Sequence, residues 1–446
     1  MKRQINSSTR AHLLRGVFYL LLLLAVGVIP LGFGQWQARA PSVKENPTIV
    51  CGYPGSWHQG ANMPSTGVRM VGIYFPSDPS NRKFYAVGGR SSDLAGSEFT
   101  HPFEYDSGSD TWTIKAATVP DNQVNNMACG VLTVSGTPYI YCVGGSAAGQ
   151  TTATARVFFY DPVADTITSL TAGDNWPGDA VGTILPGGFA VAGNKLYILG
   201  GFNINVSSTN QIWQFDPTAA VGAKWTEMTN TPEGIMYAPT CAINGIIYVG
   251  GASDYSGGTV IDTTNSFSFN PATNSIGTIA PIPRATGETR ALAFNGQMLV
   301  MGGGRVAPNP SNEVDVYFPG TNTWTVNSFV AAFMTARRNF PTDTDDFNFV
   351  FGTSHIWLAG GYGSEGTPLS SMEIWCHAVP TPSEPPCPPC GTPTGTATST
   401  PTVPPSSPTP TATMPPPPTP TVTPTASPTG RFTPLPRPRP TPAPRP

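Results

Sequence analysis

Short apolar segments alternate with polar turns along most of the chain, and six of these segments end in a pair of glycines. Each segment is rich in aromatic, β-branched and other large apolar side chains, a pattern typical of a β-strand. The spacings between successive first glycines are 56, 56, 50, 52 and 58 residues, which predicts a structural repeat of about 50 residues. The pairs are Gly88-Gly89, Gly144-Gly145, Gly200-Gly201, Gly250-Gly251, Gly302-Gly303 and Gly360-Gly361.

Each repeat contains more than the strand before its glycines. An apolar strand precedes that strand across a tight turn such as Asn244-Gly245, and Asn-Gly supplies the positive φ of a two-residue hairpin. An aromatic strand follows the glycines, often ending in Asp-Pro as at Asp161-Pro162, and then a short strand that often contains tryptophan, as at Trp112. The pattern therefore predicts a four-stranded antiparallel meander in each repeat.

The glycine pair, the Tyr-Asp-Pro step and the spaced tryptophan recur together and in order, and in this they resemble the Kelch family. The resemblance covers about residues 57–376. It departs from the pattern at Phe269-Asn270-Pro271 and where Ile167 and Ile276 replace tryptophan. The resemblance implies an all-β fold, a six-bladed β-propeller of four-stranded antiparallel blades around a central channel.

The sixth repeat lacks its tryptophan strand, whereas Ser56-Trp57 precedes the first repeat and looks like one. A propeller must join its first and last blades or leave strand edges exposed. We therefore predict that the segment around Ser56-Trp57 supplies the outer strand of the last blade, whose inner three strands come from residues 347–376.

The two ends differ from the repeat region. Residues 1–40 combine five basic residues, no acidic ones, an apolar run at 16–34 and an A-x-A spacing, which predicts a signal peptide. That run is also long enough for a retained membrane anchor. Residues 380–446 are rich in Pro, Thr and Ser and predict a disordered tail, which leaves residues 41–379 for the propeller.

Charge is distributed unevenly along the chain. The net charge is −3, residues 1–40 contribute +5 and residues 380–446 contribute +3, so residues 41–379 hold −11. An acidic body argues against nucleic acid as a partner, because nucleic-acid recognition starts from a basic patch. The export signal predicts a protein that is secreted or tethered to the outer side of the membrane or cell envelope. It would contact the membrane only through an uncleaved N-terminal segment, and we expect a monomer.

An exported chain can hold disulfides, and the sequence has seven cysteines. If Ser135-Gly136 is a two-residue loop, Cys129 and Cys142 face each other at a pair without mutual hydrogen bonds, where Cα atoms lie about 4.5 Å apart. We predict a disulfide between them.

A second predicted disulfide joins Cys51, just before the borrowed strand, to Cys376, at the end of that strand's neighbour. Cys387 and Cys390 could close a small loop in the tail, and Cys241 is left as an inert core thiol. One Cys-x-x-Cys alone lacks the four ligands of a structural metal site, so no metal is predicted.

The segments that follow the glycine pairs are long, whereas the turns on the opposite face are short. Binding residues concentrate in long loops on a rigid scaffold, so we predict a ligand-binding rim at the channel mouth; drift in loop length without any ligand is the alternative. The long segments are residues 90–102, 146–155, 202–210, 252–266, 304–312 and 362–370.

Several residues of this rim are candidates for ligand binding. Tyr255, Tyr362 and Trp176 could stack on a sugar ring, or they could cap the core. Asp343, Asp345 and Asp346 could bind Ca²⁺, but they lack the glycine and closing glutamate of an EF-hand loop, and we expect a solvated acidic loop. The candidate ligand-binding residues are Arg290, Arg305, Arg337, Arg338, Tyr255 and Tyr362.

The sequence thus predicts an exported Kelch-type propeller that binds a glycan or protein ligand through its loop-rich face, without a cofactor. The alternative is a metal-free carbohydrate-active enzyme, such as a sugar isomerase or mutarotase, which would use Glu288 and Arg290. The family resemblance also implies testing a copper-radical oxidase of the galactose-oxidase kind, which needs paired His and Tyr ligands. Four histidines lie in the body of the chain, and they do not assemble that site. We expect His58 on the borrowed strand, His101 near the rim, His355 in a short turn of the opposite face and His377 beyond the last strand.

Overall fold

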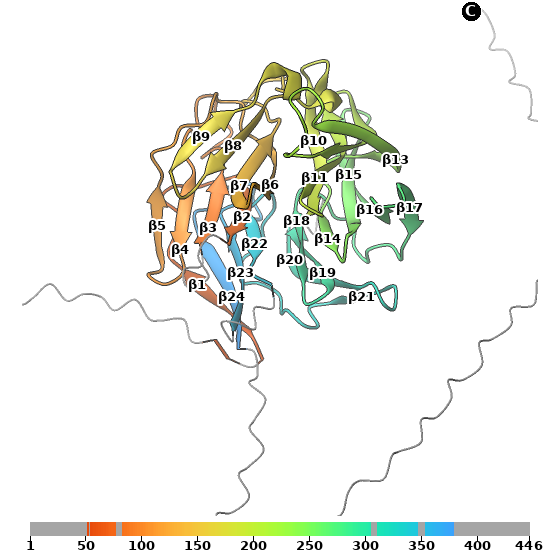
Figure 1. Ribbon diagram of the computed structural model, residues 1–446. Coiled ribbons are helices and arrows are strands. Elements are labelled where there is room, and N and C mark those ends of the chain that lie inside the picture. Colours follow the sequence, from red (N-terminus) through yellow and green to blue (C-terminus); the bar gives the residue numbers. More distant parts are fainter. Residues whose placement is uncertain (1–50, 53, 77–82, 305–309, 347–352, 379–446) are drawn as a thin grey trace, which may run out of the picture. The chain divides into compact units, whose positions relative to one another are not determined.

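The computed structural model describes residues 51–52, 54–76, 83–304, 310–346 and 353–378. These residues form six four-stranded antiparallel sheets arranged as blades around a central axis (Figure 1). Within each blade the strands pair in the order of the meander, from the innermost strand outward. This is the predicted all-β, six-bladed propeller.

The strand bounds follow the repeat. Blade one holds β2 (Val71–Phe75), β3 (Lys83–Val87), β4 (Phe103–Asp106) and β5 (Thr111–Ile114). Blade two holds β6 (Ala128–Val134), β7 (Thr137–Val143), β8 (Val157–Asp161) and β9 (Thr166–Ser169). Blade three holds β10 (Ile184–Ala192), β11 (Lys195–Asn203), β12 (Ser207–Phe215) and β13 (Trp225–Ile235).

Blade four holds β14 (Thr240–Ile243), β15 (Ile246–Ser256), β16 (Thr259–Asn270) and β17 (Ser275–Thr278). Blade five holds β18 (Arg290–Phe294), β19 (Gln297–Gly303), β20 (Ser311–Phe318) and β21 (Thr323–Val326). Blade six holds β22 (Thr342–Thr344), β23 (Thr353–Ala359), β24 (Met372–Ala378) and the N-terminal β1 (Ser56–Gly60). The helical segments of the described chain are two single 3₁₀ turns between blades two and three, η1 (Ala172–Asp174) and η2 (Pro177–Asp179).

The borrowed strand closes the propeller as predicted. β1 pairs antiparallel with β24, with Trp57 opposite Trp375, and the two strands lie side by side in Figure 1. The Trp57 indole N–H donates a 2.6 Å hydrogen bond to the carbonyl of Ala331. The predicted bounds of the blade were wrong at the inner edge, because its innermost strand, β22, lies before residue 347.

Two of the predicted loops are strand extensions. Residues 202–210 and 252–266 lie largely within the β11–β12 and β15–β16 hairpins, whose strands run for nine to twelve residues. The β15–β16 hairpin turns at Gly257-Gly258, where both residues have positive φ. These hairpins extend blades three and four on the loop-rich side.

The glycine pairs lie where neighbouring blades crowd. Gly88 has a φ of +67°, and a Cβ there would lie 2.5 Å from the carbonyl oxygen of Val124 in the segment leading into blade two. A Cβ on Gly251 would lie 2.4 Å from the carbonyl oxygen of Thr286, which precedes blade five. No L side chain fits such contacts, which explains why the pair recurs.

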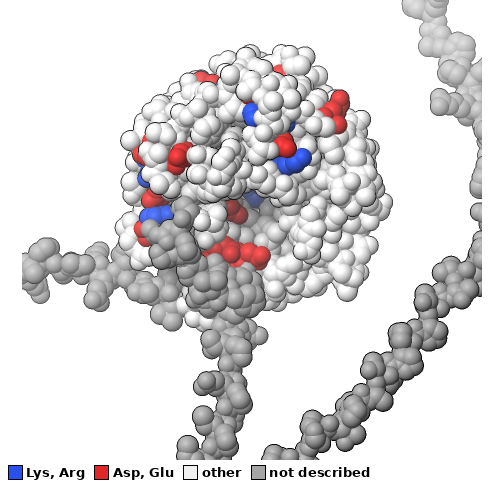
Figure 2. All heavy atoms as spheres, viewed as in Figure 1, with Lys and Arg blue, Asp and Glu red and all other residues white. Residues whose placement is uncertain are grey.

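The surface carries few charged groups, in keeping with the 11% charged residues of the chain. Figure 2 shows a mostly uncharged face with a hollow near its centre, and acidic and basic atoms border that hollow. Other charged groups of this face lie near its outer edge.

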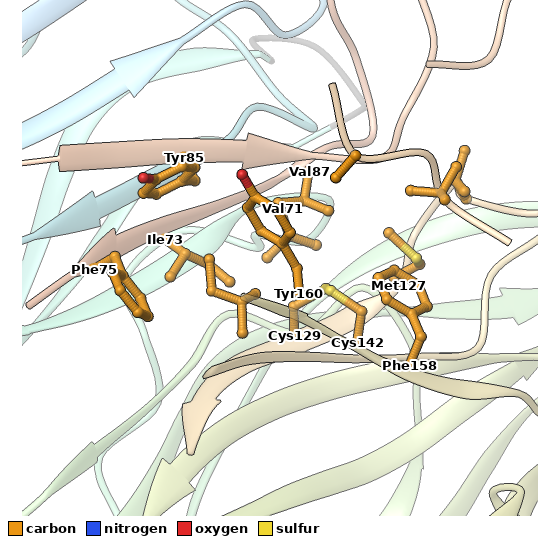
Figure 3. Close-up of a cluster of buried hydrophobic side chains, with 14 residues drawn as sticks. Val71, Ile73, Phe75, Tyr85, Val87, Met127, Cys129, Cys142, Phe158 and Tyr160 are labelled. Carbon is orange, nitrogen blue, oxygen red and sulfur yellow. A yellow bond between two sulfur atoms is a disulfide. The ribbon is translucent and has the colours of Figure 1, made fainter. Parts of the chain in front are cut away.

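Each interface between blades is an apolar core. Between blades one and two, Val71, Ile73 and Phe75 of β2 belong to one apolar cluster with Met127, Cys142 and Phe158 (Figure 3). This core contains the disulfide between Cys129 and Cys142, which lie opposite each other in the β6–β7 register with Cα atoms 4.2 Å apart.

A second disulfide joins Cys51 to Cys376, with Cα atoms 5.0 Å apart. Cys241 is a buried free thiol, and burial raises its pKa. No described helix is both long and apolar enough to cross a bilayer. The predicted export segment, the tail with Cys387 and Cys390, and Arg305 lie outside the described residues.

Candidate functional site

Five residues around the channel share an uncommon backbone conformation. Each stands shortly before the innermost strand of a different blade, and none is glycine. A non-glycine residue with positive φ is uncommon, so its recurrence in five blades is a feature of the repeat, and such strain often marks functional sites. The residues, with φ of 59°, 59°, 48°, 54° and 52°, are Arg69, Asn126, Tyr237, Glu288 and Asn339, hereafter the mouth ring.

Backbone hydrogen bonds join the mouth ring from blade to blade. The N–H of Glu288 donates to the carbonyl of Tyr237 (3.0 Å), and the N–H of Asn339 donates to the carbonyl of Glu288 (2.7 Å). Arg69 then donates to Asn339 (2.9 Å), and Asn126 donates to Arg69 (3.2 Å). Four of the five residues thus bond to the preceding blade, and blade three, which has Pro186-Gly187 here, interrupts the series.

The side chains of the mouth ring line a cavity of about 30 Å³. That volume admits one or two water-sized groups, such as the tip of a side chain. Arg290 also lines it, and its guanidinium carbon lies 4.0 Å from the centroid of the Phe189 ring. Burial lowers the pKa of Arg290, but a guanidinium remains charged at neutral pH.

Glu288 is the acidic centre of the ring and is almost fully buried. Its Oε2 accepts hydrogen bonds from Arg338 Nη1 and, at 3.0 Å, from Asn339 Nδ2. The Arg338 guanidinium in turn lies 4.5 Å from the centroid of the Tyr362 ring. The structure therefore brings together three residues that the sequence analysis named: Glu288, Arg338 and Tyr362.

Tyr362 connects the mouth ring to the long loop of blade one, residues 90–102. Its hydroxyl donates to Asp93 Oδ1 and accepts a 3.3 Å hydrogen bond from Arg90 Nη2. Arg90 also pairs with Asp93. The hydroxyl and Arg90 hold the pKa of Asp93 below its usual value, although burial opposes this.

Arg69, like Arg90, is a cation of the mouth with a side-chain nitrogen that lacks a partner. Its Nε is buried and has no hydrogen-bond partner, and its guanidinium lies 5.9 Å from the centroid of the Tyr362 ring. Burial alone would lower the pKa of Arg69, but Tyr237, Tyr362 and Glu288 raise it above the ordinary value. The mouth therefore has an excess of two positive charges, which suits an anionic ligand. The four cations are Arg69, Arg90, Arg290 and Arg338, and the two anions are Asp93 and Glu288.

Two other candidates, Arg337 and Tyr255, contact residues of the scaffold. Arg337 is fully buried inside blade six, where Nη2 pairs with Glu373 Oε1 at 2.6 Å and Nη1 donates to the carbonyl of Gly360 at 2.7 Å. Tyr255, a partly buried residue of the extended β15, packs on Phe202 with ring centroids 5.4 Å apart. Trp176 is buried and offers no open face to a sugar.

The acidic loop is not a cluster around one point, and each of its carboxylates has its own partner. Asp343 accepts the N–H of Tyr74, Asp345 contacts His355, and Asp346 accepts the N–H of Asn295. The expectation of a solvated loop was wrong for Asp345, which is buried. Burial raises the pKa of Asp343 to about 7.

The wider opening of the channel lies at its other end. A cavity of about 430 Å³ is lined by the innermost strands of all six blades and includes Asp343, Asp346 and Arg290. Arg290 lines both cavities and so separates the narrow mouth from the wide end. The loop-rich face therefore holds the built polar site, whereas the short-turn face holds the larger volume.

Sequence reasoning missed Arg69, Asn126, Tyr237 and Asn339, and also the loop residue Arg90. Aligning the repeats on the innermost strand, instead of on the glycine pair, would have placed one polar or aromatic residue two or three positions before that strand in five blades. The positive φ of those residues has no local sequence signal apart from the two asparagines.

The histidines do not form a copper site among the described residues. His58 lies on β1, as expected, and His101 hydrogen-bonds the carbonyl of Ala117 at 3.0 Å. Two placements were wrong: His355 lies on β23 rather than in a turn, and His377 lies within β24 rather than beyond it.

Comparison with known proteins supports the repeat and the fold. No family model matches the chain. The chain is 24% identical over 310 residues to mouse Kelch-like protein 23, covering 68% of this chain and 49% of that protein, so it spans about half the length of that relative. The solved structure of YjhT matches 70% of this chain and 95% of its own, with a TM-score of 0.51 and 14% identity. The repeat, the six closed blades and these similarities support a Kelch-repeat β-propeller.

Proposed function

We propose that this propeller is a protein-binding module whose mouth ring receives a carboxylate-bearing segment of its partner. Kelch-type propellers are typically protein-interaction modules. The observation that carries the proposal is the buried Arg69 Nε, which has no partner and lies beside a cavity sized for the tip of a side chain. A carboxylate would supply the missing acceptor and offset the excess positive charge.

The surroundings of the mouth favour a protein over a glycan as the partner. Of the nine large hydrophobic side chains that are exposed in the described chain, five lie on segments of the loop-rich face. Aliphatic side chains at loop tips suit contact with a protein surface, whereas Tyr362 and Trp176, which could have stacked on a sugar, are buried. The five are Leu94, Val181, Val206, Ile261 and Met334.

Selection from displayed random peptides, with the full chain as bait, tests this proposal. We expect enriched peptides to carry Asp or Glu and to bind more weakly as salt increases, because exposed charges are screened. Arg69→Gln should weaken their binding at least tenfold. Lys195→Gln is the matched control, since it removes one positive charge far from the mouth, where Lys195 pairs with Asp216.

Other outcomes would redirect the assignment. Basic or purely apolar enriched peptides, or equal binding by Arg69→Gln and wild type, would contradict the proposal. Binding of acidic sugars instead of peptides would favour a glycan module. Turnover of such a sugar, lost in Glu288→Gln, would favour the enzyme alternative, for which Glu288 stands at the mouth beside a cavity.

Export of the protein is part of this proposal. Two disulfides within one propeller are what an oxidising compartment allows. Fractionation of cells that express the chain with a C-terminal tag, followed by sequencing of the mature N-terminus, would distinguish secretion from retention by the N-terminal segment. Recovery of the protein only in the cytosol would contradict export.

A further inference from the structure

A cluster of sulfur and imidazole groups lies where the N-terminal segment closes blade six. Cys51 precedes β1, Cys376 lies on β24, and His355 lies opposite Cys376 on β23. The His355 Nε2 is 3.6 Å from each of the two sulfur atoms. These three residues form the one group in the described chain with three potential metal ligands of the Cys, His, Asp and Glu type within reach of one another.

The imidazole of His355 is held from its other side. Its Nδ1 lies 3.2 Å from Asp345 Oδ2, and its backbone N–H donates to Asp345 Oδ1 at 2.6 Å. The ring also stacks on Trp357 at 5.5 Å with an interplanar angle of 11°. A carboxylate on Nδ1 fixes the tautomer in which Nε2 presents its lone pair, an arrangement typical of histidines that bind metals.

We propose that reduction of the Cys51–Cys376 disulfide converts this cluster into a Zn²⁺ site with two thiolate ligands and one imidazole. Tetrahedral zinc with bonds of about 2.3 Å to sulfur and about 2.0 Å to nitrogen places the two sulfurs about 3.8 Å apart and the nitrogen about 3.5 Å from each sulfur. That separation is already present between Nε2 and each sulfur. Cys51 is only half-buried, so a fourth position can be filled by water.

A dithiol reductant supplies the electrons that convert the disulfide into the metal site. The dithiol is oxidised to its own disulfide, the S–S bond between Cys51 and Cys376 breaks, and each cysteine becomes a thiol. Zn²⁺ then binds both sulfurs as thiolates and releases two protons. The disulfide and the metal are therefore alternative cross-links between the same two cysteines. The metal would keep the N-terminal segment attached to β24 under reducing conditions.

The second disulfide provides an internal comparison. Cys129 and Cys142 lie in an apolar core of valine, isoleucine and aromatic side chains. No histidine or carboxylate joins them in a three-ligand group among the described residues. Reduction of that pair should therefore create no comparable site.

Cobalt binding tests the proposal. The protein is the full chain with Cys387→Ser and Cys390→Ser, because those tail cysteines could bind metal themselves. A phosphine reduces the disulfides without competing for the metal, and Co²⁺ is then added as a coloured substitute for Zn²⁺. We expect one Co²⁺ per chain, with a thiolate-to-cobalt absorption band in the near ultraviolet, tetrahedral visible bands, and displacement by Zn²⁺.

Variants decide whether the named residues form the site. The band should disappear in Cys51→Ser and in His355→Ala, persist in Cys142→Ser, and be absent from the oxidised protein. Asp345→Asn should weaken Co²⁺ binding by about 10- to 100-fold, and this variant keeps a side chain of the same shape if His355→Ala fails to fold. No band in the reduced protein, or equal binding by Asp345→Asn, would overturn the proposal.

Discussion

At the scale of single residues, the marks of the repeat act as ties between blades. The indole N–H groups of Trp112, Trp225 and Trp324 each donate a 2.8 Å hydrogen bond to a carbonyl in the segment that enters their own blade from the preceding one. Asn322 contributes in the same way, because its side chain accepts the N–H of Ala280 at 2.7 Å. The tryptophans thus recur for a hydrogen bond as well as for packing.

Replacing a tryptophan whose indole N–H is hydrogen-bonded should lower the free energy of unfolding more than replacing one whose indole N–H has no partner. We expect Trp324→Phe to lower the free energy of unfolding by about 1 kcal/mol more than Trp213→Phe, the typical net value of one hydrogen bond. Trp213 is the matched control because its buried indole N–H has no partner. Urea unfolding followed by circular dichroism measures both, and equal losses would show that the tie contributes nothing.

At the scale of elements, the decisive feature is the closure of blade six by β1. Without β1, β24 would expose an unpaired edge, and edge strands invite aggregation. The Cys51–Cys376 disulfide spans 325 residues, whereas Cys129–Cys142 spans 13. Cross-linking a longer loop restricts the unfolded chain more strongly.

The two disulfides should therefore differ in what they contribute to stability. In metal-free buffer with a chelator, we expect Cys51→Ser/Cys376→Ser to lose roughly 2–3 kcal/mol more than Cys129→Ser/Cys142→Ser by the loop-entropy relation. Urea midpoints of the two double variants against the oxidised wild type give the comparison. A larger loss for the short-range pair would contradict the view that this long-range link holds the closure.

At the scale of the whole molecule, carboxylates divide into two sets. Burial opposes ionisation of both, but hydrogen bonds and cations lower the pKa of the first set, which includes Glu104 and Asp165. Burial dominates for Asp315 and Asp343 and raises the pKa of Asp315 to about 6 and that of Asp343 to about 7. The first set stabilises the fold above the unfolded pKa of about 4, and this stability is lost as the pH falls further.

The second set has the opposite effect. A carboxyl whose pKa is raised on folding binds more protons in the native state, so stability falls as the pH rises from about 4 to about 7. We expect Asp343→Asn to reduce that fall, so that its stability relative to wild type increases between pH 4 and pH 7 and is constant above pH 8. Urea midpoints across this range test the prediction, and a flat difference would mean that Asp343 titrates normally.

The architecture follows from local signals in the amino-acid sequence. The glycine pairs, tight turns and tryptophans are local signals that recur in every blade or nearly every blade, so their period gives six meanders. The absent tryptophan strand of the sixth repeat and the extra one at Ser56-Trp57 indicate the closure and the cysteine pair beside it. Such inferences succeed because strand pairing within a meander is set by neighbours in the sequence.

Only the tertiary structure decided the chemistry. The mouth ring draws one residue from each of five blades, so nothing local shows that Arg69 meets Tyr362 and Glu288. Arg337 and Arg338 are adjacent in sequence, yet one is buried against Glu373 and the other reaches Glu288 at the mouth. Likewise, His355 meets Cys51 across 304 residues because the two ends of the chain share one blade.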